Sequence, residues 1–90
     1  MDPAKVSALD VFVRTVAQEY GLDASARLVQ PQRSNIATGE PSIEVVVVKR
    51  TASAPRQCGK AVTVRRYEQV GNSIFERFIR EEAAPKLSQA

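Results

Sequence analysis

The sequence predicts an α+β domain, a two-layer sandwich in which two helices cover one face of a three-stranded, mostly antiparallel sheet. Three observations lead to this fold class. They are an amphipathic helical pattern near the start, two segments rich in β-branched residues in the middle, and a second helical pattern after Gly71. The predicted order is helix-strand-strand-strand-helix. Each helix then has one apolar face to bury, and both apolar faces pack against the same face of the sheet.

Ninety residues are enough for one domain, so residues 1–90 are expected to fold as a single unit. The hydrophobic fraction of 43% and the charged fraction of 26% are typical of a globular protein. Residues 30–41 and 51–60 are expected to form loops because turn-forming residues gather there without periodicity. Residues 86–90 are expected to be a frayed tail, with docking of Leu87 against the core as the alternative.

The first helix is predicted over residues 3–20. Asp2 is placed to cap it, and Pro3 suits the first helical position, where no amide hydrogen is required. Asp10 and Arg14 lie one turn apart and are expected to form an ion pair. Gly21 provides the left-handed residue that ends the helix. The apolar stripe comprises Val6, Leu9, Val13, Val16 and Tyr20, widened by Phe12 and Ala17.

Three strands are predicted, over residues 26–30, 42–50 and 61–69. The middle strand has the clearest alternation, because Ile43, Val45 and Val47 share one face. The other face of that strand carries Glu44, Val46 and Val48. In the third strand, Val62 and Val64 are expected to face the core, and Thr63, Arg65 and Tyr67 to face outward. Glu44 is expected to pair with Arg65 across the strands.

The second helix is predicted to begin at Ser73. Ser73 and Glu76 match the spacing of a capping box. The apolar face consists of Ile74, Phe75, Phe78, Ile79 and Ala83. Pro85 is expected to end or kink the helix because proline has no amide hydrogen.

The composition excludes much common chemistry. The absence of histidine removes the triads and dyads that depend on it, and a single cysteine without histidine forms no structural zinc site. The segment Gln57-Cys58-Gly59-Lys60 lacks the spacing of a phosphate-binding loop, and the reactivity of Cys58 stays open. We therefore predict no catalytic residue, no cofactor and no metal site. No apolar run is long enough to cross a bilayer. The lone cysteine and the charged N-terminus favour a cytoplasmic location.

The sheet face opposite the helices is the strongest functional hint in the sequence. Exposed valines beside arginine and tyrosine are typical of protein interfaces. The predicted partner-binding residues are Val46, Val48, Arg50, Thr63, Arg65 and Tyr67. We expect a small non-catalytic module that binds protein, most simply as a homodimer in which two sheets pack face to face.

A nucleic-acid partner is the alternative. Residues 24–66 hold eight cationic side chains against two carboxylates, and such a surplus attracts phosphates. The candidate contacts are Arg27, Arg33, Lys49, Arg56, Lys60 and Arg66. The element order resembles that of double-stranded RNA-binding domains, which implies recognition of a duplex by its shape. That family begins its second helix with lysines, whereas this chain has Ser73-Ile74-Phe75-Glu76-Arg77 there.

Overall fold

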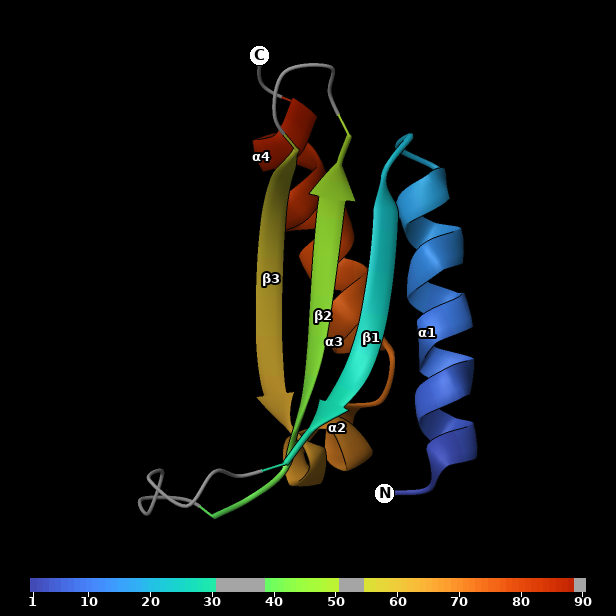
Figure 1. The fold of residues 1–90 in the computed structure, drawn as a ribbon, viewed down its shortest axis with the longest axis vertical. Helices are drawn as coiled ribbons and strands as arrows, with labels where there is room; N and C mark the ends of the chain where they lie inside the picture. Colours follow the sequence, from blue (N-terminus) through green and yellow to red (C-terminus); the bar gives the residue numbers. More distant parts are fainter. Residues whose placement is uncertain (31–38, 51–54, 89–90) are drawn as a thin grey trace.

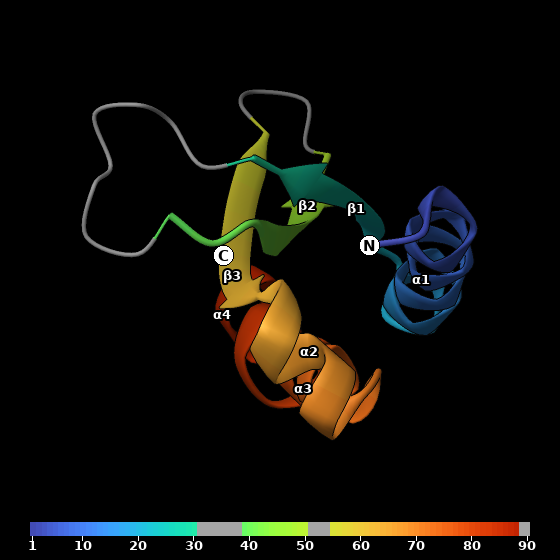
Figure 2. The same cartoon turned by 90° about the horizontal axis from the view of Figure 1, so that it is seen from below.

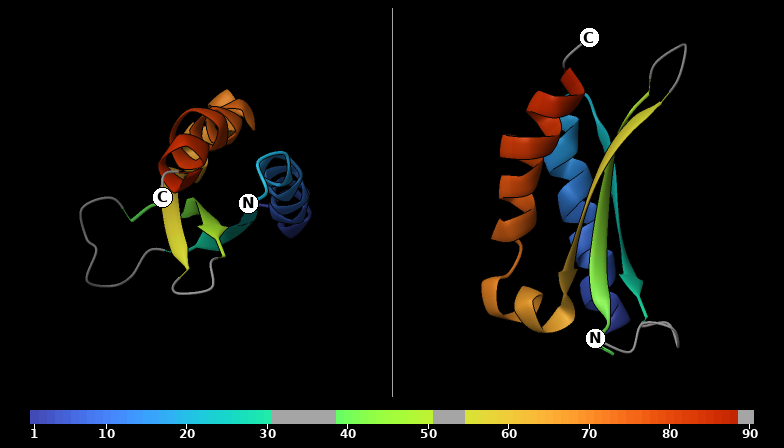
Figure 3. Two further views of the ribbon diagram at one scale, coloured as in Figure 1. Left: turned by 90° about the horizontal axis from the view of Figure 1, so that it is seen from above. Right: turned by 90° about the vertical axis from the view of Figure 1, so that its left-hand side faces the viewer.

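The computed structural model describes residues 1–30, 39–50 and 55–88, and it has the α+β architecture that the sequence predicts (Figure 1). The three strands form one antiparallel sheet in the order β1-β2-β3. Helix α1 and the C-terminal helical segments lie on the same side of the sheet (Figure 3). The elements are α1 (Pro3–Gln18), β1 (Asp23–Val29), β2 (Ser42–Lys49), β3 (Arg56–Thr63), α2 (Val64–Val70), α3 (Ser73–Arg77), the π-helix η1 (Phe78–Ala83) and α4 (Ala84–Ser88).

The ends of α1 follow the sequence signals. Asp2 accepts a hydrogen bond from the amide of Ala4 at 2.9 Å, and Gly21 has a φ of 70°, the left-handed conformation that glycine adopts without strain. The predicted ion pair between Asp10 and Arg14 is present, at 2.8 Å. Most of the predicted stripe is buried or half-buried. Tyr20 is the exception: it is 42% exposed, because it lies beyond the last helical turn and its ring meets the guanidinium of Arg80.

The sheet is built around β2, whose alternation is confirmed. Ile43, Val45 and Val47 are fully buried against the helices. β1 spans residues 23–29 rather than 26–30, because it pairs with all of β2 except Lys49, from Asp23 opposite Val48 to Val29 opposite Ser42. β1 is an edge strand, and the side of it that does not pair with β2 contacts α1. The backbone amide of Ala26 donates a hydrogen bond to the carboxylate of Asp10 at 2.9 Å.

The prediction of a third strand over residues 61–69 is wrong. β3 spans Arg56–Thr63, and Val64–Val70 form helix α2. Two features explain the switch. Backbone pairing with β2 draws residues 56–60 into the sheet, from Arg56 opposite Lys49 onward. Thr63 then caps α2, because its hydroxyl accepts from the amide of Arg66 at 3.2 Å. The predicted 51–60 loop is thereby shortened, and residues 51–54 lie outside the described part of the chain.

The C-terminal segment also departs from the prediction. Asn72, not Ser73, precedes α3, and the Ser73 hydroxyl donates to the carbonyl of Val70, so the predicted capping box is absent. Helical backbone continues past Pro85 to Ser88. The π-helix η1 ends at Ala83, two residues before Pro85, and its wider turn lies where the proline ring would otherwise meet a carbonyl of the preceding turn.

The predicted frayed tail is therefore wrong as far as the described residues extend. Leu87 is 2% exposed and belongs to the main core. The carbonyl of Lys86 accepts a hydrogen bond from the guanidinium of Arg56 at 3.3 Å, which ties α4 to the start of β3. Residues 89 and 90 lie outside the described residues.

Candidate protein interface on the open face of the sheet

One face of the sheet carries no helix, as the view from below shows (Figure 2). We call it the outer face. Residues opposite one another in an antiparallel pair point to the same side, so the register decides its membership. The outer face consists of Asp23, Ser25, Arg27 and Val29 from β1, Ser42, Glu44, Val46 and Val48 from β2, and Gln57, Gly59, Ala61 and Thr63 from β3.

Val46 stands at the centre of the outer face between two small residues. It lies opposite Ser25 on one side and opposite Gly59 on the other. A methyl group added at Gly59 would meet only the Val45 carbonyl oxygen at 3.6 Å and a methyl of Val46 at 3.8 Å, which is ordinary contact. Val46 and Val48 are both half-buried. The side chains at the centre of the outer face are therefore short, and the largest of them is the apolar side chain of Val46. It projects beside a hollow that the missing side chain of Gly59 leaves.

Charged pairs lie on either side of this apolar centre. Arg27 donates to Glu44 at 2.9 Å, and Arg50 contacts Asp23 at 3.0 Å. Glu44 therefore pairs with Arg27, and not with Arg65 as predicted. All four side chains remain substantially accessible to water, so each pair contributes about 0–1 kcal/mol to folding. Their arrangement leaves the outer face close to electrically neutral.

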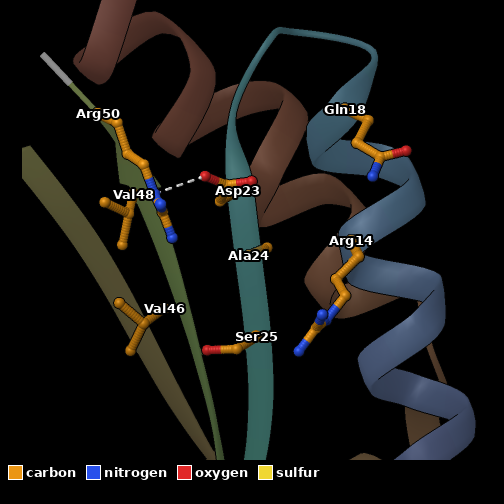
Figure 4. Close-up of a pocket in the computed structure, with 8 residues that line it drawn as sticks. All are labelled: Arg14, Gln18, Asp23, Ala24, Ser25, Val46, Val48 and Arg50. Carbon is orange, nitrogen blue, oxygen red and sulfur yellow. Dashed lines mark ion pairs between the residues drawn. The ribbon is translucent and has the colours of Figure 1, made fainter.

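A shallow groove of about 260 Å³ runs between α1 and the valines (Figure 4). Arg14 points from α1 toward β1 near Ser25, Gln18 lines the groove one turn further along α1 with its amide directed away from β1, and the ion pair between Asp23 and Arg50 lies at one end. Helix α1 thus extends the outer face beyond the sheet. The sequence pattern does not place Arg14, Gln18, Ser25 or Gly59 at this site, because their position follows from strand register and helix packing.

Two predicted partner-binding residues do not lie on the outer face. Arg65 and Tyr67 belong to α2, where Arg65 lies 3.9 Å from Glu40. The ring of Tyr67 packs against Phe75 with centroids 5.8 Å apart, and its hydroxyl bonds to the side chain of Asn72. Tyr67 is therefore part of the helical layer. Val46, Val48 and Thr63 lie on the outer face, and Arg50 follows β2 at its margin.

Burial raises the pKa of Tyr67 above its ordinary value of 10.0. The folded state then holds this proton more tightly than the unfolded state does. The resulting stability is present below pH 10.0 and is lost as the pH rises through the raised pKa of Tyr67. We expect wild-type stability to fall more steeply above this pH than that of Tyr67→Phe, as measured by urea unfolding across alkaline pH. Parallel profiles for the two proteins would contradict the burial of Tyr67.

The candidate nucleic-acid contacts do not form one surface. Arg27 is engaged by Glu44, and Arg33 lies outside the described residues. Lys49 and Arg56 face one another across β2 and β3 at one end of the sheet. The remaining two, Lys60 and Arg66, line a separate cleft between β3 and the helices. Arginines elsewhere are also paired, since Arg80 contacts both Glu19 and Glu76, at 3.1 and 3.0 Å.

Cys58 lies on the helix-facing side of β3, half-buried against the core. Within residues 1–30, 39–50 and 55–88, no group of three or more cysteine or acidic side chains is arranged to hold a metal ion. The helices in this part of the chain are all too short or too polar to cross a membrane.

Comparisons of the chain with protein-family models, with curated proteins and with solved structures gave no match.

Proposed function

We propose that this domain is a small non-catalytic interaction module that associates with a second copy of itself through the outer face. The observation that carries the proposal is the position of Val46 and Val48. Both stand on a sheet face that no described helix covers, and Val46 has a small residue on each side. Apolar side chains in a flat, neutral setting favour contact with another protein over contact with water.

The shape of the outer face suits a twofold partner. A twofold interface uses the same surface on both copies. If one residue of the first copy contacts a second residue of its partner, the reverse contact is also made. Val46 rises beside the hollow at Gly59, so Val46 of each copy can fill the hollow of the other. The ion pair of Arg27 with Glu44 lies within the same surface and can exchange partners between copies. Two sheets packed in this way stand about 10 Å apart.

The size of the outer face sets the expected affinity. Three strands of eight residues or fewer cover about 25 Å by 14 Å, or roughly 350 Å² on each copy. A stable interface of standard size buries about 800 Å² on each partner. Even with Arg14 and Gln18 included, we expect a dimer with a dissociation constant on the order of micromolar or weaker.

Replacing Val46 with aspartate is expected to separate the two copies. The change puts two carboxylates against each other near the twofold axis, where burial of an unpaired charge is costly. We expect the dimer to weaken by at least about 100-fold, which is about 2.7 kcal/mol. Sedimentation equilibrium over a series of protein concentrations measures this directly. Val48→Asp is expected to act in the same direction.

Gln69→Asp is the matched control. Gln69 is exposed on α2 in the helical layer, so the substitution adds the same charge away from the outer face. Val46→Thr is a second test, because it keeps the β-branched shape and is expected to weaken the dimer while leaving the sheet intact. A wild-type mass that stays monomeric at every concentration, or a dimer that survives Val46→Asp, would rule out self-association through this face.

Nucleic-acid binding stays the alternative prediction, and a separate measurement tests it. Retention on immobilised RNA and DNA is compared at low and raised salt, because phosphate contacts weaken steeply with salt. Weak retention that ignores salt is expected if the outer face serves protein contact. Steeply salt-dependent retention of a monomer would favour the basic residues of β3 and α2 as the functional surface.

We also propose that the protein works in the cytoplasm. Its single cysteine has no partner for an internal disulfide, and Cys58 packs against the core as a small apolar side chain.

A further inference from the structure

The outer edge of β3 is open. β3 pairs with β2 along one side, and within the described residues no strand lies beyond its other side. The right-hand panel of Figure 3 faces this edge, with β3 in front and the C-terminal helical segments beside it. An unpaired strand edge presents a row of backbone donors and acceptors that can receive another extended chain.

A cleft of about 490 Å³ lies beside this edge, between β3 and the helices. Val70, Ile74 and Phe78 give it an apolar lining, and Lys60 and Arg66 add two cations. A strand added to β3 would point every second side chain toward the helices. One such side chain would therefore enter the cleft, as in recognition modes where backbone pairing gives affinity and a pocket gives specificity.

The charges around the cleft favour an acidic side chain. Arg77 is paired with Glu81 at 3.2 Å, which neutralises both. Lys60 and Arg66 have no carboxylate partner among the described residues, and Glu82 is the remaining acid in the lining. β3 itself carries Arg56 and Lys60 and no acidic residue. An incoming carboxylate gains two charge-assisted partners here.

The same charges disfavour a second copy of β3. In the most central antiparallel registers, twofold pairing of β3 brings Lys60 of each copy close to Lys60 or Arg56 of the other. Like charges opposite one another destabilise a strand pair, and inward-pointing cations on edge strands protect sheets from pairing with their own copies. The charges of β3 therefore disfavour pairing with a second copy of β3 and favour pairing with an acidic strand.

We propose that the β3 edge and its cleft bind an extended acidic peptide segment of another protein. The segment adds to the sheet as a fourth strand beside β3, and a glutamate or aspartate side chain enters the cleft between Lys60 and Arg66. This site is separate from the outer face, so the two sites can be occupied independently.

The test uses a ten-residue peptide that alternates threonine and glutamate, with both ends blocked. Binding to the full chain is followed by changes in backbone amide NMR signals. We expect the largest changes in residues 57–63 and in the cleft lining. A matched peptide with lysine in place of glutamate is expected to bind at least about 10-fold more weakly. The acidic peptide with alternate backbone amides methylated is expected to lose binding, because strand addition requires those amides.

Lys60→Glu provides the variant test, with Lys5→Glu on α1 as the matched control. Lys60→Glu is expected to lose at least about 10-fold in affinity for the acidic peptide and to gain affinity for the lysine peptide. Lys5→Glu and Val46→Asp are expected to bind as wild type does, which keeps this result separate from that of the outer face. Circular dichroism checks that each variant is folded.

Three results would overturn the proposal. One is equal binding of both peptides, another is acidic-peptide binding that survives Lys60→Glu or amide methylation, and the third is the absence of binding. A single-stranded oligothymidylate that binds Lys60 and Arg66 when the peptide does not would assign this cleft to nucleic acid instead.

Discussion

Replacing Phe75 with alanine is expected to lower the free energy of unfolding by about 3–5 kcal/mol. Phe75 is the largest of the fully buried side chains of the described residues. It lies where α3 contacts both α1 and α2, and its ring also packs against Tyr67. A domain of this length has a total stability on the order of 5–13 kcal/mol, so one such cavity removes a large share of it.

The measurement is urea unfolding followed by circular dichroism, with Phe75→Leu as the control. Leucine keeps most of the buried volume, so we expect it to cost less than half as much as alanine. Ile74→Ala is a second comparison, because Ile74 is the half-buried neighbour of Phe75 and lines the β3 cleft. A loss below about 1 kcal/mol for Phe75→Ala would mean that the helical layer is not packed around this ring.

The parts of the fold that the sequence predicted well are those with strong periodicity. α1 has a 3.6-residue stripe with clear signals at both ends, Asp2 and Gly21. β2 alternates without interruption, and its inward residues are the most deeply buried in the sheet. Because the fold depends on these two elements and on the second helical pattern, the α+β class followed from local information alone.

β3 could not be predicted, because its own residues carry little strand pattern. Residues 56–60 are mostly polar or small, and their extended conformation comes from pairing with β2. The apolar spacing of Val62 and Val64 suggested a longer strand, yet the chain turns into α2 at Thr63. This shift moved Arg65 and Tyr67 off the outer face and placed Gln57 and Gly59 on it.

The alternation therefore placed Val46, Val48 and Thr63 on the outer face as the structure has them, and it was wrong for Arg65 and Tyr67. Val46 and Val48 depend only on the alternation of one strand, and this is why their position was predictable. Their neighbours depend on the register of β2 with β1 and β3, which is a tertiary property. The β3 cleft could not be predicted for the same reason, since it requires Lys60 and Arg66 to meet helices far along the chain.

Replacing Leu87 with alanine is expected to lower the free energy of unfolding by about 2–4 kcal/mol. Leu87 is 2% exposed although it follows Pro85, and the wide turn of η1 is what allows the helix to reach it. The variant is compared with wild type by urea unfolding. Lys86→Ala is the matched control, because the Lys86 side chain is exposed and the contact from Arg56 is to its backbone carbonyl.

We expect Lys86→Ala to change the unfolding free energy by no more than about 0.5 kcal/mol. A frayed C-terminal tail would instead give the same small effect for both substitutions. The comparison also tests the β3 edge. α4 packs beside the start of β3, and this contact holds the helical layer in place relative to that strand. If Leu87→Ala is destabilising, the helices that form one wall of the β3 cleft are anchored at their far end, and the cleft is available to a partner without prior rearrangement.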